Sequence, residues 1–290
     1  MQLSSSELIL NEDQSIYHLS LRPGDLADTI ITVGDPDRVA LVSSLFDHVE
    51  LRKGKREFIT HTGFLNQKRL SVISTGIGTD NIDIVLNELD ALVNVDFETR
   101  KVKDKKKSLT LVRLGTSGAV QPYLDLDSFV LSDCAIGFDT LPYFYQSGTP
   151  VNPEVEEAIQ QQLNWPRFRG KPYFVMANKE LIGQFSGQEA QLGCTATNTG
   201  FYGPQGRRLR LAFHDPGFLE NIMAFEYKGL KIANMEMETS GLYFLASLLG
   251  HRAVSLSCIL ANRATGTFSK DPKLAVDRLI RYVLEKISTS

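Results

Sequence analysis

Short runs of apolar residues alternate along this chain with stretches in which apolar residues recur every three or four positions. Short apolar runs are typical of buried strands, and the longer spacing is typical of amphipathic helices. The expected strands are residues 29–33, 70–74, 109–114, 129–131, 173–176, 231–234 and 253–260. Strands that alternate with helices predict an α/β domain whose central, mixed or largely parallel sheet is flanked by helices.

The helical spacing also indicates where individual helices lie. Helices are expected at residues 38–46 and 242–249, the second ending at Gly250, a residue favoured just after a helix. One helix face is marked by Ile82, Val85, Leu86, Leu89 and Val93, and a closing helix is lined by Leu274, Val276, Leu279, Ile280, Val283 and Leu284. With no internal repeat or low-complexity linker, one domain over residues 1–290 is expected.

One stretch breaks this pattern, the lysine-rich segment at residues 100–107. It lies between a predicted helix and a predicted strand. A solvated connecting loop is favoured over a binding patch, because charge runs are usually solvated.

Composition excludes several classes of protein. The net charge of -3 gives no reason to expect a nucleic-acid partner. Cys134, Cys194 and Cys258 are far apart without a CxxC pair, which indicates core positions rather than a zinc site or a disulfide framework. No apolar stretch approaches the ~20 residues of a membrane span, and the first residues lack a signal-peptide pattern. We therefore expect a cytoplasmic protein without a membrane partner.

Two segments combine glycine, a hydroxyl or carboxylate side chain, and arginine at the end of an apolar strand. They are Gly34-Asp35-Pro36-Asp37-Arg38 and Arg113-Leu114-Gly115-Thr116-Ser117-Gly118. Ligands of α/β sheets bind just beyond the carboxyl ends of strands, where glycine amides and arginine forks suit an anion. A Gly-Asp-Pro turn is common by itself, but Arg113 stands in an apolar run, where arginine is rare without a partner. The pair predicts a bound oxyanion, most plainly phosphate.

Two further segments carry candidate chemistry. Glu236 and Glu238 would share one face of an extended chain and could accept hydrogen bonds from sugar hydroxyls. Spacing alone favours the simpler role of Glu238 near the positive end of a helix. Gln205 and Arg207 supply the donors and the acceptor that a pyrimidine amide edge needs, although Gly203-Pro204 also resembles a surface turn.

The order of these motifs resembles the nucleoside phosphorylase family, most closely its uridine-specific branch. The matching pieces are His18-Leu19, Gly34 to Arg38, Arg56-Glu57-Phe58, Ser74 to Gly78, Arg113 to Gly118, Phe201 to Arg207, Glu236-Met237-Glu238 and Asn262-Arg263. The resemblance implies a single α/β domain with a mixed, partly barrel-like sheet. It also reverses the preference for a purely structural Glu238.

The resemblance implies a role for each matching residue. Phosphate would be bound by Gly34, Arg38, Arg113 and Thr116, with Arg56 lent across a dimer interface. Ribose would be bound by Glu236, Met237 and Glu238, with His18 reaching the 5′-hydroxyl from the neighbouring subunit. The base would be bound by Phe201, Gln205, Arg207, Leu260 and Ala261.

The implied activity is that of a pentosyltransferase, the reversible phosphorolysis of uridine to uracil and ribose 1-phosphate. The implied assembly is a homo-oligomer with a dimer as its minimal unit and a hexamer as the larger assembly left open. Inorganic phosphate is the co-substrate, and no other cofactor is implied. A purine nucleoside phosphorylase, a nucleosidase and a non-catalytic nucleoside or phosphate sensor stay open as alternatives, although Leu260-Ala261-Asn262-Arg263 lacks the carboxylate of purine members.

This chain departs from the family pattern in three places. Ser117 stands where a second threonine is frequent, and the lysine-rich segment resembles an insertion. Some members hold a monovalent cation between subunits with a glutamate and a serine. Glu57 is present, but Asn81 stands in the place of the serine, so no metal is assigned.

Overall fold

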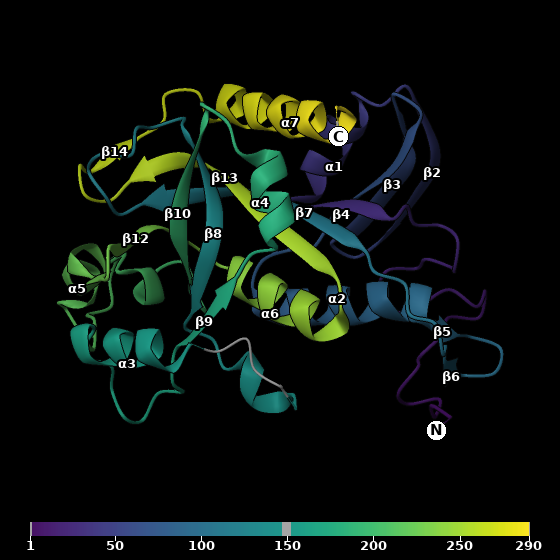
Figure 1. Ribbon diagram of the computed structural model, residues 1–290, viewed down its shortest axis with the longest axis horizontal. Coiled ribbons are helices and arrows are strands. Elements are labelled where there is room, and N and C mark those ends of the chain that lie inside the picture. Colours follow the sequence, from purple (N-terminus) through teal and green to yellow (C-terminus); the bar gives the residue numbers. More distant parts are fainter. Residues whose placement is uncertain (1, 147–151, 290) are drawn as a thin grey trace.

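A twelve-stranded sheet forms the centre of the computed structural model, which describes residues 2–146 and 152–289 (Figure 1). Residues 1, 147–151 and 290 of the expected domain lie outside this description. Its strands are β1 (Thr29–Val33), β2 (His48–Lys55), β3 (Phe58–Leu65), β4 (Lys68–Ser74), β7 (Thr110–Ala119), β8 (Phe129–Gly137), β9 (Tyr173–Met176), β10 (Ala190–Thr197), β11 (Glu226–Tyr227), β12 (Leu230–Glu236), β13 (Arg252–Asn262) and β14 (Thr267–Phe268). Both parallel and antiparallel pairs occur, as the sequence predicts.

Part of this sheet closes on itself. The strands follow the order β11-β12-β10-β8-β13-β7-β1-β4-β3-β2, and β12 also pairs with β7. Met235 lies opposite Gly118 in this antiparallel pair, and Asn234 donates a hydrogen bond from Nδ2 to Ser117 Oγ at 2.8 Å. The extra pairing completes a ring of β7, β12, β10, β8 and β13, which confirms the expected barrel-like sheet.

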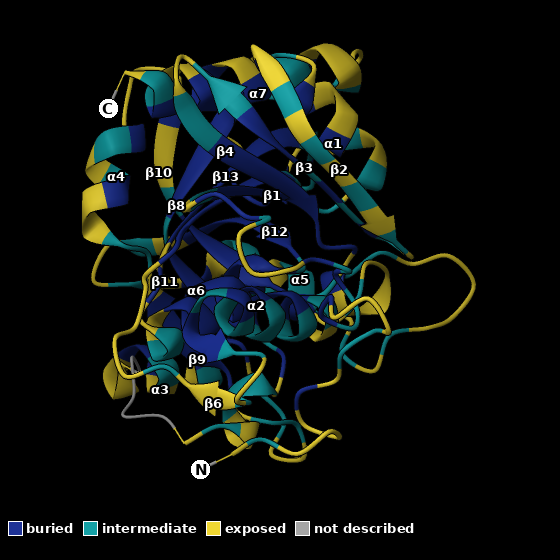
Figure 2. Cartoon of the chain, turned by 90° about the vertical axis from the view of Figure 1, so that its right-hand side faces the viewer, coloured by how far each residue is buried: buried dark blue, intermediate teal, exposed yellow. Residues whose placement is uncertain are grey.

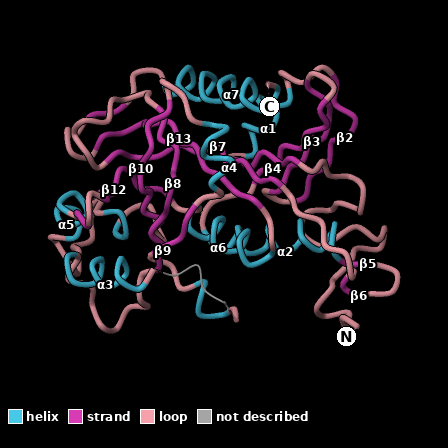
Figure 3. The backbone as a smooth tube through the Cα atoms, in the orientation of Figure 1, coloured by secondary structure: helices cyan, strands magenta, loops and turns pink. Residues whose placement is uncertain are grey.

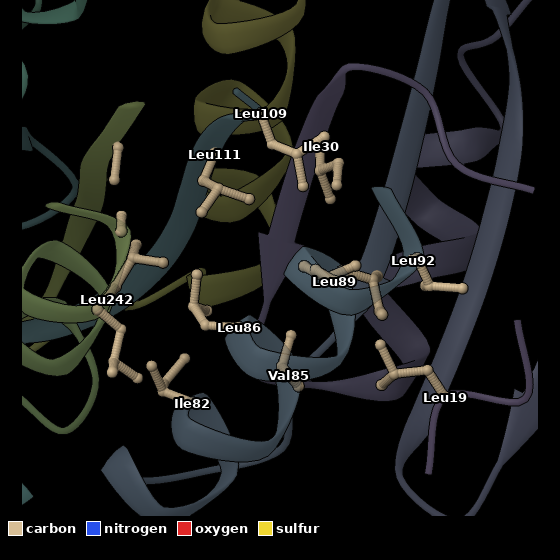
Figure 4. Packing of buried hydrophobic residues seen from close by; sticks show 14 of the residues in the cluster. Leu19, Ile30, Ile82, Val85, Leu86, Leu89, Leu92, Leu109, Leu111 and Leu242 are labelled. Carbon is tan, nitrogen blue, oxygen red and sulfur yellow. The ribbon is translucent and has the colours of Figure 1, made fainter. Parts of the chain in front are cut away.

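Helices cover both faces of the sheet. They are α1 (Pro36–Ser43), α2 (Thr79–Asn94), α3 (Pro153–Gln162), α4 (Lys179–Phe185), α5 (Phe218–Ala224), α6 (Thr239–Leu249) and α7 (Pro272–Ser288). On one side α2 and α6 pack against the sheet, with Leu86 of α2 near Leu111 and Leu242 (Figure 4). On the other side α1, α4 and α7 share a second apolar core with β1 and β13. The strands between these helices are largely buried (Figure 2).

Several expected boundaries need correction. The first helix begins at Pro36, because Asp35 caps it by accepting a hydrogen bond from the amide of Asp37, and it ends at Ser43. The segment from Gly115 to Gly118 is not a loop beyond a strand. It belongs to β7, which continues to Ala119 because Gly118 and Ala119 pair with β12.

The sequence pattern also missed elements. Strands β2 and β10 have few apolar runs, and β2 alternates exposed and half-buried residues at the sheet edge. In the lysine-rich segment, β6 (Lys101–Val102) pairs with β5 (Val95–Asp96), so the expected loop is partly a short ribbon. Leu274 of the closing helix is exposed rather than part of its lining.

The three cysteines are buried and free, as expected from their apolar surroundings. Loops join the elements at both ends of the sheet (Figure 3). Among the helices that the structure describes, none is both long and apolar enough to span a membrane.

Candidate active site

A cavity of about 780 Å³ opens beside the barrel, and it brings together the predicted site residues from five separate parts of the chain. The predicted residues that line it are Gly34, Arg38, Arg113, Thr116, Phe201, Gln205, Arg207, Glu236, Met237, Glu238, Leu260 and Ala261. Two predicted residues, His18 and Arg56, do not line this cavity.

Arg113 is the buried cation of this cavity. Its Nη2 contacts both Glu238 Oε2 and Glu236 Oε2, the latter at 3.1 Å. Burial by itself would lower the pKa of Arg113, but the carboxylates of Glu236 and Glu238 raise it above its ordinary value. The arginine therefore stays charged, and its anionic partners are the two glutamates that the sequence singled out.

Gly115 makes room for this guanidinium. A Cβ atom at Gly115 would lie 2.0 Å from Arg113 Nη1 and 2.6 Å from Ser257 Oγ. Because real Cβ atoms do not approach other atoms so closely, a side chain here would displace the arginine. Packing around Arg113 therefore explains why glycine stands at this position of β7, in the segment that the sequence predicted to bind an oxyanion.

The two glutamates differ in how much of their hydrogen-bonding capacity is used. Glu236 accepts from Thr197 Oγ1 at 2.6 Å and from the amides of Glu238 and Thr239, which begin α6. Glu238 Oε1 accepts from the amide of Gly78 at 2.8 Å. Glu236 therefore acts mainly as an anchor for Arg113 and α6, whereas Glu238 is the glutamate with capacity left for a ligand.

Burial sets the charge balance around Glu238 and Arg38. Burial raises the pKa of Glu238 above its ordinary value, although Arg113 opposes this shift. Burial likewise lowers the pKa of Arg38, whose Nη1 donates to the carbonyl oxygen of Leu114 at 3.2 Å. That contact places Arg38 against β7, on the same side of the cavity as Arg113.

The loop at residues 201–207 forms the other wall. Gln205 is buried, and its Oε1 accepts from Arg207 Nη1. The same Nη1 donates to the carbonyl oxygen of Phe201 at 2.9 Å, and the guanidinium stands 3.9 Å from the centre of the Phe201 ring. Burial, followed by repulsion from Arg263, lowers the pKa of Arg207 to about 10, so it remains a cation at neutral pH.

Arg263 holds this loop in place, and Asn262 beside it holds the segment at residues 121–124. Arg263 donates to the carbonyl oxygens of Gln205 and Gly206, each at 2.9 Å. Asn262 donates to the carbonyl oxygens of Gln121 and Leu124 and has its own oxygen occupied by nearby amides. Arg263 therefore fixes the wall at residues 201–207 from just beyond the end of β13, whereas Asn262 ties that strand end to residues 121–124.

His18 and Arg56 lie together on a different surface. His18 Nδ1 is 2.6 Å from Glu88 Oε1, and its ring packs edge-on against Tyr17. Arg56 is exposed, adopts a left-handed φ of 55°, and lies 5.9 Å from the Tyr17 ring. Two residues from separate segments thus share a surface outside the cavity of their own chain.

Some residues of the site were missed by the sequence pattern. Gly78 was matched as part of a motif, but its contact with Glu238 was not foreseen, and neither were the roles of Thr197 and Ser257. Phe268 also lines the cavity, from a strand of only two residues that leaves no periodic signal. Glu57 and Asn81 line it too, and both side chains lie beside the position that a Cβ atom at Gly76 would take. In the described ranges no three His, Cys, Asp or Glu side chains gather closely enough to hold a metal ion.

Comparison with known proteins identifies the family. A family model described as the phosphorylase superfamily matches residues 28–287. The chain belongs to the phosphorylase superfamily. This membership agrees with the resemblance of its motifs to those of nucleoside phosphorylases.

Named relatives in the superfamily cover nearly the whole chain. A uridine phosphorylase of Thermococcus kodakarensis is 30% identical over 92% of this chain and 84% of its own length. The uridine phosphorylase of Escherichia coli is 28% identical over 86% of each chain. Relatives named DeoD-type purine nucleoside phosphorylases match at 24–26% identity.

A solved structure agrees with the fold in detail. It is described as a Trypanosoma brucei nucleoside phosphorylase that shows uridine phosphorylase activity. It superimposes with a TM-score of 0.88 at 27% identity, covering 98% of this chain and all of that one. The expected fold of this superfamily member is therefore confirmed over almost its full length.

Proposed function

We propose that this protein is a uridine phosphorylase, which converts uridine and inorganic phosphate reversibly to uracil and ribose 1-phosphate. The observation that carries the proposal is that one cavity holds the Arg113–Glu238 pair beside the Gln205–Arg207 pair. The first pair suits a phosphate next to a sugar. The second offers the donors and acceptor that a pyrimidine edge requires.

The chemistry needs no protein nucleophile, because phosphate attacks C1′ of the ribose. Arg38 and Arg113 place the phosphate, with the backbone of Gly34 and the hydroxyl of Thr116 as further ligands. Glu238 accepts hydrogen bonds from the ribose hydroxyls, and Met237 packs beneath the sugar. Holding both reactants in line supplies catalysis by orientation.

Charge develops on the base as the glycosidic bond lengthens. Arg207 and Gln205 would stabilise the negative charge that spreads over the uracil carbonyls, an interaction stronger in the transition state than in the ground state. Phe201 would pack on the base, and Leu260 and Ala261 would complete its pocket. Inorganic phosphate is the co-substrate, and the proposal requires no other cofactor.

The proposed active unit is a homo-oligomer, with a dimer as its minimal form. Arg56 and His18 lie on a shared surface outside the cavity of their own chain. From there Arg56 would contact the phosphate, and His18 the 5′-hydroxyl, in the site of a neighbouring subunit. A cytoplasmic location stays a prediction from the sequence.

The test is a panel of nucleosides assayed with and without phosphate by ultraviolet absorbance. Loss of uridine absorbance that depends on phosphate is the expected result. Loss without phosphate would indicate a nucleosidase, and turnover of inosine or adenosine in place of uridine would indicate a purine enzyme. No turnover of any nucleoside would favour a sensor.

A further inference from the structure

A second cavity, of about 800 Å³, lies on the opposite side of the loop at residues 201–207 from the candidate active site. Phe201 and Gln205 line the active site, whereas Tyr202 and Pro204 line the second cavity. Arg207 lines both. The lining of the second cavity includes Phe218 of α5 and Trp165, which follows α3. These two helices lie at the same end of the molecule (Figure 1).

One wall of this second cavity is formed by aromatic side chains. Phe138 and Trp165 stack with their ring centres 4.9 Å apart and an interplanar angle of 19°. Phe218 packs edge-on against Phe138 at 5.8 Å. Trp165 is fixed because its Nε1 donates to the carbonyl oxygen of Gly170 at 2.8 Å. Such a rigid aromatic surface suits a planar ring.

The charges around this wall are mainly positive. Arg169, Arg207 and Arg210 line the cavity, against the single carboxylate of Asp215. The Oδ1 of Asp215 is already occupied, since it accepts from the amide of Gly217 at 3.1 Å. Arg169 also lies over the Trp165 ring, at 5.3 Å. This balance favours an anion next to the aromatic wall.

Asn198 supplies a fixed and unpaired acceptor. It lines the cavity and is almost completely buried, and its Oδ1 has no hydrogen-bond partner among the described residues. Its Nδ2 donates to the carbonyl oxygen of Ala196 at 3.3 Å, which fixes the orientation of the amide. A buried acceptor without a partner is costly, so a ligand N–H at this point would be favourable.

From these features we propose that the second cavity binds a planar heteroaromatic anion with a ring N–H, such as a pyrimidine carboxylate. The ring packs against the aromatic wall that Phe138, Trp165 and Phe218 form, the anionic group pairs with Arg169 and Arg210, and the N–H donates to Asn198 Oδ1. The inference goes beyond the proposed function, because binding here requires no turnover.

Occupancy of this cavity would also reach the active site. Arg207 lines both cavities and holds Gln205 through Nη1. The backbone N–H of Asn198 donates to the backbone carbonyl oxygen of Glu236 at 2.8 Å. A ligand here therefore contacts the base wall and the strand end that carries the carboxylates.

The experiment uses the whole protein and orotate as the probe. Trp165 is the only tryptophan in the chain, so its fluorescence reports directly on this cavity. Saturable quenching by orotate is expected, with an affinity about tenfold weaker in R169A and R210A because each loses a charge-assisted contact. R208A is the matched control, since Arg208 is exposed and lines neither cavity, and it should bind as the parent does.

Competition separates this site from the substrate cavity. With uridine present and phosphate absent, the apparent Kd for orotate should stay unchanged or reach a plateau. An apparent Kd that rises without limit as uridine increases would place orotate in the substrate cavity and overturn the proposal. Quenching that never saturates, or that R169A and R210A leave unaltered, would overturn it as well. Thermal unfolding verifies that each variant is folded.

Discussion

The guanidinium of Arg113 pairs with the carboxylate of Glu238 inside the cavity, and both side chains are almost fully buried. Arg113 lies within β7, and Glu238 immediately precedes α6. The pair therefore joins the proposed phosphate site to the proposed ribose site through one contact.

Replacing Glu238 by glutamine should test this connection. The variant E238Q keeps an acceptor for the amide of Gly78 but loses the charge that faces Arg113. Hydrogen bonds to charged groups contribute about 1.5–3 kcal/mol, so kcat/KM should fall by about 10- to 100-fold. Steady-state kinetics with uridine and phosphate measures the loss, and E220Q, an exposed change on α5, is the control. Parent-like kcat/KM in E238Q would exclude a sugar-binding role.

Removing Arg207 should lower kcat much more than it lowers stability. The side chain is half-buried, so R207A should unfold near the parent temperature. Loss of a donor to a developing oxyanion costs about 3 kcal/mol, which predicts a kcat about 100-fold lower. R208A, one residue along the same loop, should keep the parent kcat. A near-normal kcat in R207A would contradict its role at the base.

Adding a methyl group at Gly115 should inactivate the enzyme with little unfolding. In G115A the new Cβ meets the end of the Arg113 side chain, which can move away more easily than backbone can. We expect activity at least about 100-fold lower, because displacement of a charged contact costs about 3 kcal/mol. G183A is the control, since nothing lies within 4 Å of a Cβ there and alanine favours the helix. Equal activities of the two variants would contradict this role for Gly115.

Subunit mixing should test whether Arg56 serves a neighbour. R56A and R113A should each be inactive, while a mixture refolded together should regain about a quarter of the parent activity from pairs with one intact site. The assay follows uridine phosphorolysis after differently tagged subunits are shown to co-purify. Mixing R56A with the R56A/R113A double variant should restore nothing. A co-purifying but inactive R56A and R113A mixture would contradict the shared site.

The buried carboxyl of Asp139 should give stability a specific pH dependence. Burial raises its pKa, although Tyr173 and Ser240 donate to its Oδ2 at 2.7 and 3.2 Å. A raised pKa in the folded state means that stability is full below the unfolded value of about 4 and is lost as the pH rises through the folded value. Urea unfolding should therefore show that the free energy of unfolding of the parent falls relative to D139N between pH 4 and pH 7. A difference that grows with pH would contradict this assignment.

Much of this architecture follows from residue pattern alone. Apolar runs located β1 and β13, and the three-and-four spacing from Ile82 to Leu89 located α2, because burial on one face dictates that spacing. The residue pattern wrongly predicted that the strand ends before Gly115, since nothing in the local sequence shows that β7 continues to pair with β12. It also failed for Thr197 and Ser257, ordinary core hydroxyls whose roles depend on distant partners.

Closure of the barrel between β7 and β12 has a consequence for how the protein acquires activity. The residues that meet there, Gly118 and Met235, are far apart in the sequence, and contacts of that kind form late because a long loop must first be closed. A partly folded chain therefore has the motifs but no site. Return of catalysis during refolding should therefore lag behind return of secondary structure, because barrel closure and subunit association must both come first.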